Sequence, residues 1–215
     1  MSWKVAVLLG TVMVVAVCVA RFLQDTETGT ATWDASRASG FAGYLLLWLS
    51  TVTGIALHMR FRPLQFSLTR SLELHRITSA LALSFVVAHV LALLLDPVVQ
   101  FNVIDGIVPF TSDYRSIQVG MGTIAQWLLV LVLSSTALAG VIPYSWWRQL
   151  HYLGFPCYVL SLLHGFTAGS DSTQVVGALL YAVTAASVAF LLVLRVVGRG
   201  WAEASEPVLP QPRGL

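Results

Sequence analysis

Long runs of hydrophobic residues alternate with short polar segments along almost the whole chain. A helix that crosses the hydrocarbon core of a bilayer needs about 20 mostly apolar residues, and six segments satisfy this length. They are roughly residues 4–23, 40–58, 72–95, 118–142, 147–168 and 174–196. Because lipid offers the backbone no hydrogen-bond partners, each segment is predicted to be an α-helix. The pattern therefore predicts an all-α integral membrane protein, a bundle of six transmembrane helices.

The composition agrees with this class of protein. Of the 215 residues, 57% are hydrophobic and 10% are charged, whereas a soluble domain carries about 25% charged residues. The net charge of +2 is too small to indicate nucleic-acid binding, and no nucleic-acid partner is expected. The first 23 residues resemble a signal peptide, with Lys4 ahead of an apolar run, but no small-x-small cleavage site follows. We interpret this segment as a transmembrane helix. Cys18 and Cys157 lie in apolar spans outside any CxxC pair, and we expect them to pack as small apolar residues.

Charged residues divide the connecting segments into two alternating groups. Arginines mark the 59–71 loop, the 143–150 turn and the C-terminal end: Arg60, Arg62, Arg70, Arg148, Arg195 and Arg199. Acidic residues mark the other segments: Asp25, Glu27, Asp34, Asp96, Asp105, Asp113 and Asp171. Positive residues remain on the cytoplasmic side. The charges therefore predict a multi-pass protein of the cell's inner (plasma) membrane with both termini in the cytoplasm. A short interfacial helix is expected in the outer 97–117 loop, and a disordered tail in 199–215.

Four histidines lie inside two of the predicted helices. They are His75 and His89 on the third, and His151 and His164 on the fifth. Ionisable side chains at membrane depth are costly and usually mark a functional site, and imidazole is a common axial ligand of haem iron. Fourteen residues separate His75 from His89, which is about 21 Å and nearly four turns, so both point to the same face. The topology pairs His75 with His151 near the cytoplasmic face and His89 with His164 near the outer face, for two stacked haems.

The second histidine spacing is the less regular one. Thirteen residues separate His151 from His164, about 3.6 turns, which leaves the two rings poorly aligned on an ideal helix. Pro156 lies between them and can distort the helix. Structural histidines, each capping a helix or hydrogen-bonded, are the alternative, as is one haem instead of two. A bound haem is expected to be of the b type, because the chain has no CxxCH attachment motif.

Three further polar residues stand near the predicted sites. Arg76 follows His75, and Arg115 lies in the outer loop. Arginine pairs strongly with carboxylates, so both residues are candidate partners of haem propionates. Snorkelling of their side chains to the membrane interface is the alternative. His58 ends the second predicted helix and is expected to be solvated, with a proton-relay or quinone role as the alternative.

Two segments of the chain resemble a known family. LHRITSALALSFVVAHVLALLLDP and WWRQLHYLGFPCYVLSLLHGFTAGSD are similar to the haem-binding helices of the ferric reductase-like transmembrane domain family. This family includes the transmembrane parts of ferric reductases and NADPH oxidases. It also includes the haem-binding membrane subunit of the bacterial methionine sulfoxide reductase system, which is similar in size. The resemblance implies that the four histidines named above are haem ligands. It covers roughly residues 40–198, between an N-terminal segment (1–39) and the tail (199–215).

The resemblance also implies an electron-transfer function. The chain has no Gly-rich dinucleotide fingerprint after a strand, so we expect it to need an external donor. A cytoplasmic flavoprotein reductase or membrane quinol is the expected donor. A periplasmic or extracellular redox partner, a ferric chelate or oxygen is the expected acceptor. The alternatives are an accessory or structural haem subunit of a larger membrane redox complex, and a haem-free transporter or channel subunit.

Overall fold

The computed structural model describes residues 31–59, 67–97, 99 and 101–204, and this part of the chain is all helical. Its elements are α2 (Ala31–His58), α3 (Leu68–Leu94), α4 (Val103–Ile107), α5 (Ser116–Ala137), α6 (Tyr144–Tyr152), α7 (Gly154–Ala168), the 3-10 helix η2 (Ser170–Thr173) and α8 (Val175–Ala204). The predicted all-α class is confirmed for these residues.

Four of the described helices are long and apolar enough to cross a membrane. They are Ala31–His58, Leu68–Leu94, Ser116–Ala137 and the Val175–Val197 part of α8. The predicted span at 4–23 lies outside the described residues, so the total of six spans stays a prediction. α8 continues to Ala204, into the segment predicted to be a disordered tail. Ala, Arg and Glu, which favour helices, are frequent in that stretch.

The fifth predicted span is not one helix. Where the pattern predicted a continuous helix over 147–168, α6 ends at Tyr152 and α7 begins at Gly154. The break has a local cause, because Pro156 lacks an N–H and its ring would clash with the carbonyl of Tyr152 in a continuous helix. In the first turn of α7 the missing N–H has no cost, since those groups have no partner within the helix. The prediction of a distortion near Pro156 is confirmed, because the helix is interrupted at Leu153.

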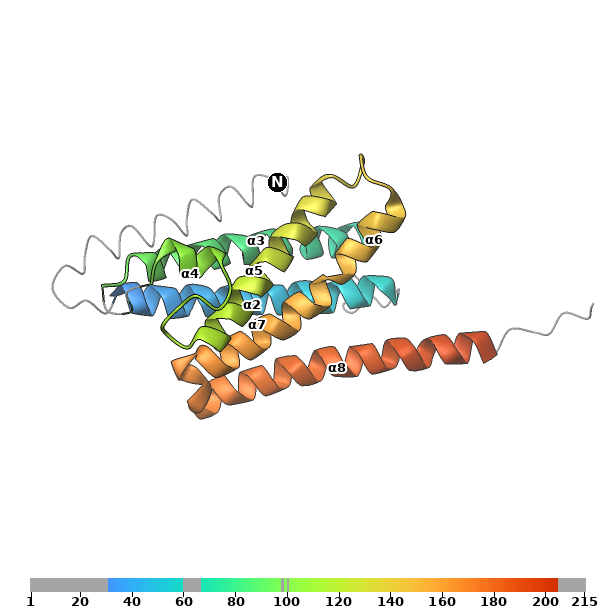
Figure 1. Cartoon of the computed structure of the whole chain (residues 1–215). Helices are drawn as coiled ribbons and strands as arrows, with labels where there is room; N and C mark the ends of the chain where they lie inside the picture. Colours follow the sequence, from blue (N-terminus) through green and yellow to red (C-terminus); the bar gives the residue numbers. More distant parts are fainter. Residues whose placement is uncertain (1–30, 60–66, 98, 100, 205–215) are drawn as a thin grey trace, which may run out of the picture.

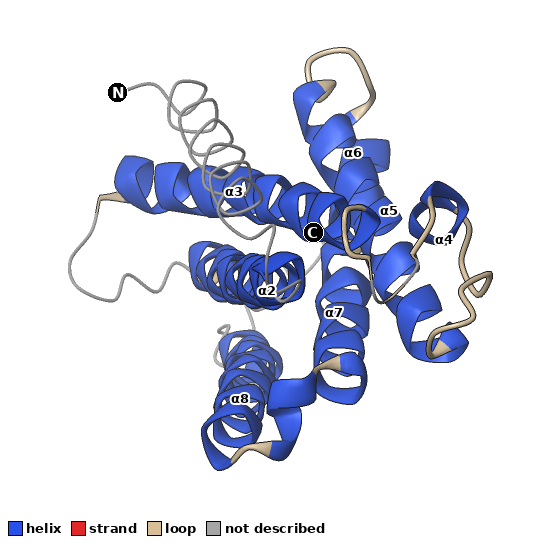
Figure 2. Ribbon diagram, turned by 90° about the vertical axis from the view of Figure 1, so that its left-hand side faces the viewer, coloured by secondary structure: helices blue, strands red, loops and turns tan. Residues whose placement is uncertain are grey.

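α2 occupies the centre of the bundle. It packs along α3 and also contacts α7 and α8, while α5 and α7 form a second pair. Figure 1 shows α2 and α3 side by side with α5 and α7 crossing them, and in the end view of Figure 2 α2 lies between α3, α7 and α8. Two imidazoles of α3 donate hydrogen bonds to backbone carbonyls of α2: His89 donates to Ser36 and His75 donates to Ser50. α2 and α3 are therefore antiparallel neighbours over most of their length.

A short helix is present in the 97–117 loop, as predicted: α4 lies against α5, and its interfacial position stays a prediction. Asn102 and Asp105 form a capping box at its start. Its C-terminal carbonyls accept hydrogen bonds from α5, where Gln126 donates to Gly106 over 3.3 Å and Trp127 to Ile107 over 2.8 Å. These side chains satisfy carbonyls that a helix end leaves without partners. These hydrogen bonds hold α4 against one end of the bundle. We call this end the α4 end.

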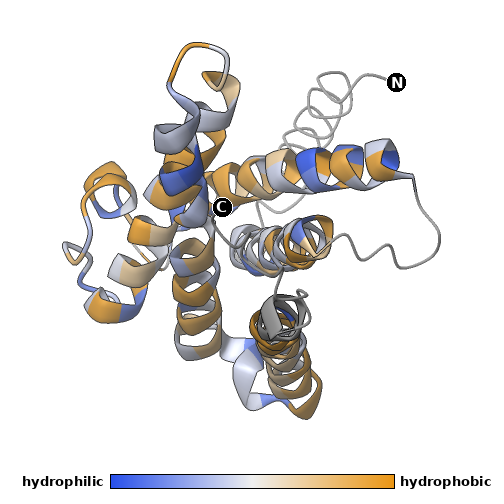
Figure 3. Cartoon of the chain, turned by 90° about the vertical axis from the view of Figure 1, so that its right-hand side faces the viewer, coloured by the Kyte–Doolittle hydropathy of each residue, from blue (hydrophilic) through white to orange (hydrophobic). Residues whose placement is uncertain are grey.

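Hydrophobic side chains cover the outside of the long helices. Figure 3 shows orange positions around α7 and α8, and on α8 the side chains of Val183, Phe190 and Val196 are 62%, 62% and 71% exposed. Large exposed apolar surfaces on a soluble protein would promote association. On a multi-pass membrane protein they are the surface that faces lipid, so this surface agrees with the hydropathy.

Buried hydroxyl groups join α2 to α7 and α8 at mid-depth. Tyr44 contacts Thr184 over 2.5 Å and Tyr158 over 3.5 Å, and its ring packs against Tyr181 at a centroid distance of 5.0 Å. The hydroxyl of Thr184 also donates to the carbonyl of Leu180 over 2.9 Å. The Tyr44 hydroxyl is therefore the donor in its bond to Thr184, since the single proton of the threonine is already committed.

The variant Tyr44→Phe tests this contact between helices. It deletes the Tyr44–Thr184 hydrogen bond but leaves Thr184 with a partner, so we expect a loss of about 1 kcal/mol in the free energy of unfolding. For a chain of this size that is a fall of about 2–4 °C in the melting temperature measured in detergent. Tyr152→Phe, at an exposed tyrosine, is the matched control. A Tyr44→Phe protein as stable as the wild type would show that the bond contributes nothing.

Candidate functional site

The fold brings the four histidines together in the predicted pairs. His75 of α3 faces His151 of α6, with ring centroids 5.9 Å apart and ring planes at 69°. His89 of α3 faces His164 of α7, with centroids 6.2 Å apart and planes at 76°. The helix break at Leu153 removes the alignment problem of the 13-residue spacing, because the two histidines of the second segment belong to different helices.

The separation of the rings suits one metal ion between each pair. Two imidazole nitrogens bound on opposite sides of an ion, each at about 2 Å, place the ring centroids about 6 Å apart. Within the described parts of the chain, no group of three or more His, Cys, Asp or Glu residues could hold a metal. Each pair thus offers two nitrogens, whereas a structural zinc site usually takes four protein ligands. Two axial ligands are what a haem iron takes, so both pairs fit this cofactor.

Three of the four imidazoles donate a hydrogen bond to a backbone carbonyl. Nδ1 of His75 lies 2.9 Å from the oxygen of Ser50, and Nδ1 of His89 lies 2.8 Å from the oxygen of Ser36. Nδ1 of His164 lies 2.8 Å from the oxygen of Gln118. A carbonyl oxygen only accepts, so each Nδ1 carries the proton. In a neutral ring the lone pair is then on Nε2, which is the arrangement found in metal-binding histidines.

A glycine follows each of these three carbonyls by four residues. A Cβ on Gly40 would lie 2.8 Å from Nδ1 of His89, and a Cβ on Gly122 would lie 2.7 Å from Nδ1 of His164. A Cβ on Gly54 would lie 3.2 Å from Cε1 of His75. Real Cβ atoms are rarely found at such distances. The glycines therefore let the imidazole rings lie against α2 and α5 and reach the carbonyls.

His151 is the exception among the four. Its Nδ1 is buried and has no hydrogen-bond partner in the part of the chain that the structure describes, and the same is true of Nε1 of Trp147. The two rings are stacked, with centroids 5.1 Å apart and planes at 24°. Trp147 thus fixes the orientation of the His151 ring by stacking instead of by a hydrogen bond.

A cavity lies between α2, α3, α5 and α7 at the level of the second pair. Its walls include His89 and His164, and glycines of three helices, Gly40, Gly122 and Gly165, form part of its surface. Side chains at these glycine positions would project toward the imidazoles and Tyr181. Such a cavity, with His89 and His164 facing each other and glycines in its walls, fits a flat macrocycle.

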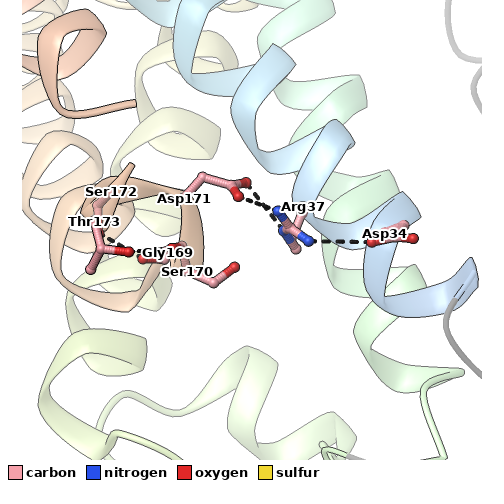
Figure 4. Close-up of polar contacts among 7 residues, drawn as sticks. All are labelled: Asp34, Arg37, Gly169, Ser170, Asp171, Ser172 and Thr173. Carbon is pink, nitrogen blue, oxygen red and sulfur yellow. Dashed lines mark hydrogen bonds and ion pairs between the residues drawn. The ribbon is translucent and has the colours of Figure 1, made fainter. Parts of the chain in front are cut away.

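Arg37 lies in the cavity wall, and the sequence pattern did not single it out. It bridges Asp171, at the start of η2, and Asp34, whose oxygen is 3.3 Å from the arginine (Figure 4). Its Nε also donates to Asp171 over 3.1 Å. The i,i+3 spacing of Asp34 and Arg37 was a weak signal in the sequence. The contact with Asp171, which is 134 residues away, was not visible there. The ion pair connects α2 to the segment that links α7 and α8.

The two predicted propionate partners lie in different settings. Arg115 donates to the carbonyls of Thr167 and Ala168 over 2.9 and 3.1 Å, so it caps the C-terminus of α7. Arg76 is exposed on α3 beside His75. Their role toward a haem stays a prediction. His58 is exposed and ends α2, which agrees with its predicted interfacial position.

The comparison with protein families identifies the chain. The family model described as "Ferric reductase like transmembrane component" matches residues 38–162, more than half of the sequence, so the chain belongs to this family. The match includes His75, His89 and His151 and ends two residues before His164. No curated protein and no solved structure matches the chain. Together with the apolar helices, family membership defines a multi-pass membrane protein and suggests transmembrane electron transfer.

Proposed function

We propose that the chain carries electrons across a membrane through two b-type haems, one held by His75 and His151 and the other by His89 and His164. The observation that carries this proposal is the meeting of the histidines in two pairs at about 6 Å. Structural histidines would need neither this pairing nor the Nδ1 hydrogen bonds that leave Nε2 available on His75, His89 and His164. A bound haem supplies an iron that gains and loses one electron, and the protein supplies ligands and surroundings.

The residues of the chain have separate tasks in this function. The carbonyls of Ser36, Ser50 and Gln118 hold the Nδ1 protons of three ligands and keep their Nε2 atoms available. The helix break brings His151 and His164 into line with the two α3 histidines. Apolar side chains and the tyrosines between the two levels exclude water, and control of solvent access and dielectric is one of the means by which a protein sets a redox potential.

The charge pattern supports a direction of electron flow, and the family resemblance supports the classes of partner. The basic 59–71 loop and Arg148 suggest that the end of the bundle near α6 faces the cytoplasm of a plasma (bacterial inner) membrane. A cytoplasmic flavoprotein reductase or a quinol then reduces the His75/His151 haem. A periplasmic or extracellular redox partner, a ferric chelate or oxygen oxidises the His89/His164 haem. The end near α4 carries the acidic side chains Asp96, Asp105 and Asp171, in keeping with the outer face.

Electron transfer across a sealed membrane tests the proposal. We expect that liposomes containing the haem-loaded chain reduce cytochrome c trapped inside when dithionite is added outside. Liposomes without protein, or with a His89→Ala chain, are expected to keep the trapped cytochrome c oxidised, because the path between the two faces is missing or broken. If the haems of the wild-type chain become reduced while the trapped cytochrome c stays oxidised, the proposed conduit is wrong.

A further inference from the structure

α2 presents the same short pattern twice to the histidines of α3. Ser36 and Gly40 meet His89, and Ser50 and Gly54 meet His75 at the other level. Fourteen residues separate the two serines and the two glycines, as they do the two histidines. This spacing is nearly four helical turns, so both copies lie on one face of α2. The serine hydroxyls also lie 3.1 and 3.2 Å from the two Nδ1 atoms. The two α3 histidines therefore meet the same set of groups on α2: a serine carbonyl, a serine hydroxyl and a glycine.

α5 presents the corresponding pattern only once. Gln118 and Gly122 meet His164. Fourteen residues further along α5, Val132 stands in the position that corresponds to Gln118. Thr136 stands in the position that corresponds to Gly122. The carbonyl of Val132 already accepts the hydroxyls of Ser135 and Thr136, over 2.8 and 2.9 Å.

α5 thus offers no glycine cradle at the level of His151. This matches the unpartnered Nδ1 of His151 in the described part of the chain. One difference between the two pairs is therefore a hydrogen bond at a ligand. Both ligands of the His89/His164 pair donate to carbonyls, whereas within the described residues only His75 of the His75/His151 pair does.

An acceptor on Nδ1 makes an imidazole a stronger electron donor to its metal. A stronger donor stabilises the oxidised iron more than the reduced iron, and hydrogen bonding around the ligands is one of the means by which a protein sets a haem potential. We propose that this missing hydrogen bond gives the His75/His151 haem the higher reduction potential of the two. The inference rests on the proposed function, since it requires haem in both pairs.

The asymmetry has a consequence for electron flow. A single electron on the protein resides mainly on the His75/His151 haem, the one nearer α6. Movement from there to the His89/His164 haem is then uphill and is driven by the strength of the donor or the acceptor. The haem at the α4 end is the stronger reductant, which suits it to pass electrons to an external acceptor.

Potentiometric measurements on the purified, haem-loaded chain test this inference. We expect two steps in the wild type. In His164→Ala, which retains the His75/His151 haem, we expect the upper step alone, and in His151→Ala we expect the lower step alone. The reverse order, or equal potentials in the two variants, would overturn the inference while leaving the two haems in place. A wild-type chain without haem would overturn the proposed function and the inference with it.

A milder variant assigns the steps without removing a ligand. In Gly54→Ala the new Cβ, 3.2 Å from the His75 ring, weakens the bond to the Ser50 carbonyl. We expect the upper step alone to move, to a still higher potential. Gly140→Ala, where a Cβ meets nothing within 4 Å, is the control and is expected to move neither step. A shift of the lower step alone in Gly54→Ala would assign the potentials the other way and contradict the inference.

Discussion

The variant His89→Ala is expected to bind about one haem per chain instead of about two, and to keep the haem at His75 and His151. The substitution removes one of two axial ligands, and the facing His164 then has no partner ring. The two pairs are independent in this respect, because His75 and His89 are separated by about 21 Å along α3. His75→Ala is expected to give the complementary result, with the His89/His164 haem retained.

The measurement is haem content per chain, by pyridine haemochrome absorbance against protein concentration. His58→Ala makes the same substitution at an exposed histidine at the end of α2 and is the matched control, with an unchanged haem content. If His89→Ala retained as much haem as the wild type, the assignment of His89 as a ligand would be wrong. Loss of both haems in a variant that remains folded would show that the pairs depend on each other.

The second large effect is expected from one methyl group, in Gly122→Ala. In an ordinary helix this change stabilises by about 1 kcal/mol, because glycine is a poor helix former. Here the new Cβ would lie 2.7 Å from Nδ1 and 2.8 Å from Cε1 of His164. The ring must move away from the Gln118 carbonyl, which breaks its hydrogen bond and moves Nε2 out of position. We expect the His89/His164 haem to be lost or greatly reduced and the other haem to remain.

Gly140→Ala is again the control, since its Cβ contacts nothing. Comparing the haem content and the melting temperature of the two variants separates a local effect on the site from a general loss of stability. Normal haem content in Gly122→Ala would mean that His164 does not need the close approach to α5, which would weaken its assignment as a positioned ligand.

The periodicity of the sequence predicted more of the site than of its surroundings. The pairing of His75 with His151 and of His89 with His164 followed from helix rise and topology, and both pairs are present. The break after Tyr152 was signalled by Pro156, although a distortion was expected where the structure has two helices. Helix periodicity describes one helix at a time and predicts which residues share its face. That was sufficient to find the paired histidines.

The groups that accept hydrogen bonds from the histidines lie on other helices, and helix periodicity could not predict them. The groups on Ser36, Ser50 and Gln118 that accept the histidine hydrogen bonds are backbone carbonyls. Every residue has such a carbonyl, so no side chain marks these positions in the sequence. Only the packing of α2 on α3, and of α5 on α7, shows which carbonyls meet an imidazole. Glycine in a membrane helix is common at any helix contact, and the role of Gly122 is visible only from the distance to His164.

The most direct test of the account is the reduced-minus-oxidised visible spectrum of the purified wild-type chain, with haem quantified per chain. We expect a b-type spectrum with about two haems per chain, both bound by two imidazoles. One haem per chain would mean that one of the two histidine pairs does not bind its proposed haem. No haem absorbance in a folded chain produced with sufficient haem supply would contradict the account, because the paired histidines would then have a different role.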